Sequence, residues 1–165
     1  MPSDMDIYEH QNFGHRLGFG ARAALLIVDF VNGFEDPDRF GGGNISEACD
    51  NSVALLAACR ELGLPIAYTR VVFDADGGDE NVFCRKVPPL RELTEDAPAG
   101  QIVERLAPRS GEIILRKRLP SAFAGTDLAA NFTHRGVDTV LVAGCVTSKR
   151  MTPICAFSAR SMPTS

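Results

Sequence analysis

The stretch Ala24-Leu25-Leu26-Ile27-Val28-Asp29-Phe30 decides the fold, because it is a near-continuous apolar run that reaches a carboxylate at Asp29. A strand of a parallel sheet is apolar throughout when helices cover both faces of the sheet. Ligands of open α/β sheets collect beyond the carboxyl ends of such strands, where Asp29 would lie. Taken alone, an Asp at a strand end is as often a turn former or loop cap, so a functional interpretation needs support from other strands.

The rest of the chain repeats the alternation of strands and helices. A helix is expected to start at Ser46 and stop at Gly63, and another to start at Thr126 and stop at Gly136. Further strands are expected at 65–73, 112–116 and 139–143, with a short helix near 102–106. This rhythm predicts an α/β fold of Rossmann type, in which helices flank a parallel sheet in three layers. The connection 74–111 is long for a small domain, which favours a functional cover such as a lid.

The bulk properties exclude several classes of function. With 165 residues the chain fits one domain, residues 1–165, whose first 22 residues form a polar arm. A net charge of −4 gives no basic field for nucleic acid or for a membrane surface. No run could span a bilayer, and the start Met1-Pro2-Ser3-Asp4-Met5-Asp6 lacks the pattern of a secretory signal, so a cytoplasmic location is expected.

Cofactor motifs are absent from the sequence. Five cysteines without CxxC spacing and three widely separated histidines argue against a disulfide framework and a metal site. The glycine triplet at 41–43 has neither of the common phosphate-loop spacings, which makes a nucleotide-binding module improbable. We therefore expect no metal and no cofactor.

Two later strands end in residues whose side chains could take part in catalysis. One closes on Arg116-Lys117-Arg118 and the other on Gly144-Cys145-Val146-Thr147-Ser148. A lysine near a thiol would lower the pKa of that thiol, and a carboxylate could then carry its proton. Asp29 and Lys117 are therefore expected side by side at the ends of adjacent strands and facing one cleft. A purely structural ion pair is the alternative.

Three motifs in order resemble the isochorismatase-like cysteine hydrolases. They are the run from Leu26 to Phe34, Arg116-Lys117 with the following Pro120-Ser121-Ala122-Phe123, and Val142-Ala143-Gly144-Cys145-Val146-Thr147-Ser148. The resemblance extends from Phe13 to Ser148 and is strongest to the branch of N-carbamoylsarcosine amidase and maleamate amidohydrolase. It implies hydrolysis of a small carbamoyl or amide acid through a thioester. We also expect the chain to form a homo-oligomer. Asp29 would be the general base, and Lys117 the cation that stabilises the thiolate and the intermediate.

The sequence departs from the family at the nucleophile. The family pattern G-C-x-T-S-G-C places the reactive cysteine where this chain has Arg150. Cys145 is expected to be structural, and Cys155 would lie too far along a helix to replace the nucleophile. Residues 149–165 do not match the family, so its C-terminal strands and helices are expected to be missing, through a frameshift, a truncation or a real variant. The chain is therefore either an inactive amidohydrolase or a remnant that binds a small acid or a subunit.

Overall fold

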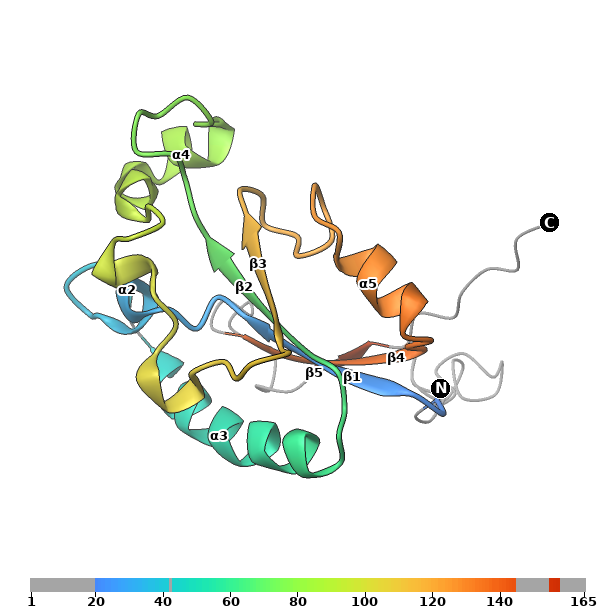
Figure 1. Cartoon of the computed structure of the whole chain (residues 1–165). Helices are drawn as coiled ribbons and strands as arrows, with labels where there is room; N and C mark the ends of the chain where they lie inside the picture. The colour runs from blue at the N-terminus through green and yellow to red at the C-terminus, as the bar shows by residue number, and fades with distance from the viewer. Residues whose placement is uncertain (1–19, 42, 145–154, 158–165) are drawn as a thin grey trace, which may run out of the picture.

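Five strands form one sheet in the computed structural model, which describes residues 20–41, 43–144 and 155–157. Strands β1 (Ala23–Val28), β2 (Ile66–Val71), β3 (Ile113–Lys117) and β4 (Thr139–Gly144) are parallel and lie in the order β3-β2-β1-β4 (Figure 1). The parallel α/β fold that the sequence predicts is confirmed. The N-terminal arm and most of the tail lie outside the described residues.

A short strand, β5 (Cys155–Phe157), adds to the sheet in an antiparallel direction beside β4. The sequence placed Cys155 in a helix, and this prediction is wrong because residues 155–157 pair with Val140–Val142. Parallel crossovers can be predicted from the alternation of helices and strands. This pattern gives no sign of a short antiparallel strand such as β5.

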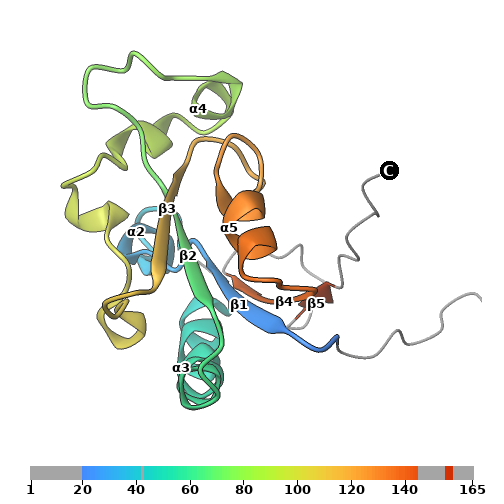
Figure 2. The ribbon, with the colours of Figure 1, turned by 45° about the vertical axis from the view of Figure 1, so that its right-hand side comes forward.

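Strand β1 is the central strand of the five-stranded sheet and is almost fully buried, as its apolar run predicts. Two helices cover opposite faces of the sheet, α3 (Ile45–Glu61) on one side and α5 (Leu128–His134) on the other (Figures 1 and 2). Because side chains alternate along a strand, Leu25 and Ile27 pack on the α3 side, whereas Ala24 and Leu26 pack on the α5 side.

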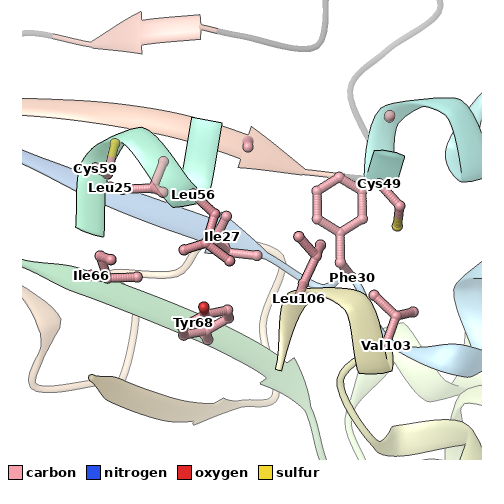
Figure 3. Packing of buried hydrophobic residues seen from close by; sticks show 12 residues of the cluster. Leu25, Ile27, Phe30, Cys49, Leu56, Cys59, Ile66, Tyr68, Val103 and Leu106 are labelled. Carbon is pink, nitrogen blue, oxygen red and sulfur yellow. The ribbon is translucent and has the colours of Figure 1, made fainter. Parts of the chain in front are cut away.

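The core on the α3 side joins that helix to β1 and β2. Figure 3 shows its buried side chains, which come from both strands, from α3 and from residues 103–106 (Leu25, Ile27, Phe30, Cys49, Leu56, Cys59, Ile66, Tyr68, Val103 and Leu106). Burying one leucine or phenylalanine of this kind contributes about 1.5–3 kcal/mol. This cluster fixes β1, and with it the position of Asp29.

The helix boundaries differ from the predicted ones by one or two residues. Gly63 has a left-handed φ of 65° and ends α3 as predicted. Ser46 lies inside the first turn of α3, where its hydroxyl donates to Glu35, and Asn44 takes the N-cap position. Thr126 accepts a hydrogen bond from the Leu128 N–H at the start of α5, but Asp127 is the capping residue.

The long connection after β2 forms a structured cover at the carboxyl ends of the strands. It contains α4 (Val82–Lys86) and the 3-10 helices η1 (Pro88–Glu92), η2 (Pro98–Gly100) and η3 (Glu104–Leu106), and η3 replaces the predicted helix at 102–106. With α2 (Asn32–Glu35) it encloses a third apolar cluster, which includes Phe34, Val71, Phe73, Leu90 and Leu93. These buried contacts fix the cover to the rest of the domain. Its movement as a lid stays a prediction.

The same connection holds the chain that leaves β1. The Val103 N–H donates to the Phe30 carbonyl at 3.0 Å, and the Asn32 N–H donates to the Gln101 carbonyl at 2.9 Å. Arg70 on β2 is buried and donates to the Gly100 carbonyl at 2.6 Å. The backbone that follows Asp29 is thereby tied to the connection, and Arg70 ties the connection to β2.

No helix in the described part of the chain is long and apolar enough to cross a bilayer.

Candidate active site

The Asp29 carboxylate and the Lys117 ammonium form a buried ion pair at the carboxyl edge of the sheet. Lys117 Nζ lies 2.7 Å from Asp29 Oδ2, and the two side chains are 2% and 9% exposed. The predicted proximity of these residues is confirmed. Their predicted origin on adjacent strands is wrong, because β2 lies between β1 and β3 and the pair reaches across it.

The backbone at Asp29 explains how the carboxylate reaches across β2. Asp29 has a φ of 57°, and it is the non-glycine residue with a left-handed conformation among the residues that the structure describes. Regular alternation would point its side chain toward α3, as for Ile27. The left-handed turn instead brings the carboxylate to Lys117, which shares the α5 side with Leu115. Such a conformation costs on the order of 1 kcal/mol or more, and this kind of strain is concentrated at functional sites.

Thr69 on β2 is the third member of the site, and the sequence analysis missed it. Its hydroxyl lies 2.7 Å from Asp29 Oδ1 and its side chain is buried. A signal existed, since Thr69 is a polar residue near the carboxyl end of a fully buried strand. A buried hydroxyl is costly unless it is hydrogen-bonded, so it indicates a polar partner nearby.

Three oxygens of described residues neighbour the Lys117 ammonium. Besides Asp29 it donates to the carbonyls of Leu119 at 3.3 Å and Pro120 at 3.1 Å. An ammonium has three donors and no acceptor, so this arrangement suits the charged form. The loop that follows β3 therefore holds the cation in place.

Burial is the main cause of the Asp29 titration behaviour. It raises the pKa of the Asp29 carboxyl above its ordinary value, and the opposing effects of the Lys117 charge and the hydrogen bonds from Lys117 and Thr69 do not cancel it. A carboxylate with a raised pKa beside a fixed cation can accept and return a proton. The arrangement suits general acid–base chemistry.

The other predicted residues divide into two groups. Arg150, which is predicted to occupy the nucleophile position, and Cys145 lie outside the described residues. Arg116 and Arg118 flank Lys117 and form ion pairs at the rim, Arg116 with Glu95 at 3.0 Å and Arg118 with Asp79. Both arginines neutralise neighbouring carboxylates at the rim.

Two of the three cysteines whose side chains the structure describes lie away from this pair. Cys49, Cys59 and Cys84 are free and fully buried. Burial raises the pKa of Cys49 to about 11, which leaves it protonated at neutral pH. Cys49 and Cys59 belong to the core on the α3 side, away from the α5 side that Thr69 and Lys117 share.

Gly144 brings the end of β4 close to Asp29. A methyl group added at Gly144 would lie 3.0 Å from Val28 Cβ and 3.2 Å from the Val28 carbonyl oxygen. Only a residue without a side chain allows this approach between β4 and β1. Strand β4 therefore ends next to the residue that precedes Asp29.

A cavity of about 420 Å³ lies beside α2 and η2. Asn32, Asp36, Arg39 and Glu92 line it together with residues 97–99, and neither Asp29 nor Lys117 does. The expected opening of the ion pair onto a cleft stays a prediction. No group of three or more His, Cys, Asp or Glu side chains in the described region is placed to hold a metal ion.

Two curated proteins with similar sequences are named as amide hydrolases. Maleamate amidohydrolase of Pseudomonas putida is 37% identical over 142 residues, which cover 82% of this chain and 65% of that protein. N-carbamoylsarcosine amidase of an Arthrobacter species is 33% identical over 151 residues, covering 85% of this chain and 57% of that protein. The chain thus spans less than two thirds of the length of these relatives.

Solved structures share the fold. A cysteine hydrolase of Pseudomonas syringae superposes with a TM-score of 0.72 at 29% identity, over 76% of this chain and 60% of that one. An isochorismatase family protein of Desulfovibrio vulgaris gives a TM-score of 0.66 at 31% identity, over 76% and 67% of the two chains. The family model for the isochorismatase domain matches residues 23–149. The chain belongs to the isochorismatase family.

Proposed function

We propose that the chain derives from an amidohydrolase that acts on small carbamoyl or amide acids, of the N-carbamoylsarcosine or maleamate type. Asp29 is the general base and Lys117 the stabilising cation in this proposal. The observation that carries it is the buried pair at 2.7 Å, held by a left-handed backbone at the carboxyl edge of the sheet. The amide hydrolases among its relatives support the choice of substrate class.

The proposed chemistry needs a thiol beside this pair. Asp29 takes the thiol proton, the thiolate attacks the amide carbonyl carbon, and Lys117 stabilises the negative charge that develops. Asp29 then gives the proton to the leaving nitrogen, so that ammonia departs and a thioester remains. Water gives a proton to Asp29 as it attacks the thioester, and the acid is released with the thiolate restored.

Arg150 stands where the family has its nucleophile, so we propose that this chain does not turn over substrate. A guanidinium stays protonated at any usable pH and cannot attack a carbonyl. Loss of a nucleophile commonly lowers kcat by several orders of magnitude, even when binding survives. The proposal thus separates the family chemistry from the activity of this chain.

Ammonia release tests the proposal. The unmodified chain should release none from maleamate or N-carbamoylsarcosine, whereas replacing residues 149–165 by the matching segment of an active relative should give turnover. Asp29→Asn and Lys117→Met in the grafted protein should abolish it, with Arg39→Met as the control. Turnover that survives loss of Asp29 would refute the proposed base. Hydrolysis by the unmodified chain that alkylation abolishes would show that another cysteine is the nucleophile.

Binding without turnover is the second candidate, and the arginine at position 150 favours it because a cation suits an acidic ligand. The chain would then bind small acids at the Asp29–Lys117 site or bind a partner subunit. Isothermal titration of the unmodified chain with maleamate tests this candidate, since a heat of binding supports it and the absence of binding contradicts it.

The proposed partners are the small acid and a second copy of the chain. Strand β3 is at the edge of the described sheet, and its Ile114 is 51% exposed. Exposed apolar residues on an edge strand favour association. Light scattering should show an oligomer that Ile114→Glu weakens; a monomer at all concentrations would contradict this.

A further inference from the structure

The Asp29 carboxylate is held from two different strands, through two different oxygens. Oδ2 faces Lys117 of β3 at 2.7 Å, and Oδ1 faces Thr69 of β2 at 2.7 Å. Two contacts on opposite oxygens fix the rotation of the carboxylate plane, which a single ion pair would leave free. Thr69 thus supplies an orientation that Lys117 alone cannot.

The Thr69 hydroxyl must donate in this contact. The ion pair with Lys117 favours the ionised carboxylate, which has only acceptor sites, so the hydroxyl proton points to Asp29. The side chain of Thr69 is buried, and its branched Cβ restricts rotation of the hydroxyl. The donor is therefore prearranged before any substrate binds.

Strand geometry explains why Thr69 occupies this place. Its Cα pairs with Val28 of β1 and with Leu115 of β3, so it lies between the two strands that supply the ion pair. Thr69 and Lys117 point to the same side of the sheet as Leu115, and the left-handed φ of Asp29 turns its carboxylate toward both. The contact is a consequence of that turn and of the central position of β2.

We propose that Thr69 is a positioning residue for Asp29, one that orients the carboxylate and favours its ionised form. The proposal rests on the function proposed above, because orientation matters only if Asp29 moves protons. In that reaction Oδ2 stays with Lys117, and the Thr69 hydroxyl holds Oδ1 in one direction during both proton transfers. The charge that acts on Asp29 from the described elements around it is Lys117.

The test is a titration of the unmodified chain and its variants with ¹³C-labelled aspartate carboxyls, followed by NMR. Thr69→Val keeps the shape but removes the donor, so the Asp29 pKa should rise by about one unit, since a hydrogen bond to the ionised form is lost. Thr69→Ser keeps a hydroxyl and should restore a pKa near that of the wild type. A purely structural role for Thr69 would leave the Asp29 pKa unchanged in all variants, and this result would overturn the proposal.

Thr139→Val is the matched control. Thr139 is a buried threonine at the opposite end of β4, and its hydroxyl contacts Asp138 at 3.0 Å. This variant should raise the pKa of Asp138, which that hydrogen bond helps to lower, and leave Asp29 unchanged. A shift of Asp29 in Thr139→Val equal to that in Thr69→Val would show a general loss of packing and overturn the assignment.

A second measurement needs no folded variant. In the unmodified chain the Thr69 Cβ and hydroxyl resonances should move with the Asp29 titration, because the hydroxyl donates to the group that titrates. Thr69 resonances that stay constant through that titration would overturn the proposal. These readouts do not depend on turnover, so the failure of the grafted enzyme to release ammonia would refute the proposed function without affecting them.

Discussion

Two ion pairs of similar length connect distant parts of this chain, yet they differ in character. Lys117 and Asp29 meet at 2.7 Å at the carboxyl edge of the sheet, and Arg60 and Glu112 meet at 2.7 Å between α3 and the start of β3. Burial acts to raise the pKa of both carboxyls. Hydrogen bonds from Arg60 and the Arg109 N–H reverse the effect for Glu112, whose pKa is lowered, whereas the pKa of Asp29 stays raised.

The difference distinguishes a structural pair, which only holds two elements together, from what we call the working pair, whose carboxyl can exchange a proton. Arg60 contacts both oxygens of Glu112 with its planar fork and also reaches Tyr68, an arrangement that holds the carboxylate ionised. Among the described residues, Lys117 contributes a point charge and Thr69 a hydroxyl to Asp29, whose backbone is strained. The first arrangement fastens a helix to a strand, while the second leaves a carboxyl that can still take up a proton.

Removal of the Lys117 cation should have the largest effect on stability. Lys117→Met leaves Asp29 buried without its charge partner, and breaking such a pair costs on the order of 3–5 kcal/mol. The folded-state pKa of Asp29 should rise further above the unfolded value, so the variant should be most stable at acidic pH and lose stability as pH rises through the folded pKa. Urea unfolding at pH 5 and pH 8 measures this, and equal losses at both values would contradict it.

The structural pair should respond less, and its response should change with pH in a more acidic range. Arg60→Met should cost about 2 kcal/mol at neutral pH, because the pair is partly exposed and Glu112 can regain water. The depressed pKa of Glu112 contributes stability above its unfolded value and loses it as pH falls through the folded pKa. Urea unfolding extended below the ordinary pKa of a glutamate should therefore show the variant approaching the wild type, whereas its loss should be nearly equal at pH 5 and pH 8. A loss larger than that of Lys117→Met would reverse the comparison.

Much of this fold follows from local patterns. The apolar run at 24–30 identified the central strand, and the left-handed Gly63 ended α3 where the sequence predicts. The partners Asp29 and Lys117 were recognisable because both lie at strand ends beside family motifs. The strand order was not recognisable. The position of β2 between β1 and β3 depends on which strands pair, and local sequence does not determine this pairing. Thr69 was missed for the same reason, because its role comes from lying between β1 and β3.

The smallest predicted effect concerns the close approach of β4 to β1. Gly144→Ala would place a methyl group 3.0 Å from Val28 Cβ and push the end of β4 away from the residue before Asp29. Overpacking of this kind costs about 1–3 kcal/mol, and relaxation at the strand end should keep it near the lower limit. Gly63→Ala serves as the comparison, because its added methyl group has open space around it but the residue keeps a strained φ. Comparing the Tm of the two variants separates the steric cost from the conformational cost. An unchanged Tm in Gly144→Ala would show that the contact does not constrain the site.

The most direct test of the working pair is the titration of Asp29 and Glu112 in the unmodified chain by carboxyl-labelled NMR. Both residues are observed in one sample, so each is the internal reference for the other. The account predicts that Asp29 titrates above the ordinary range of an aspartate and Glu112 below that of a glutamate. An Asp29 carboxyl that titrates below its ordinary value, as Glu112 should, would make the pair with Lys117 a structural ion pair and contradict the account.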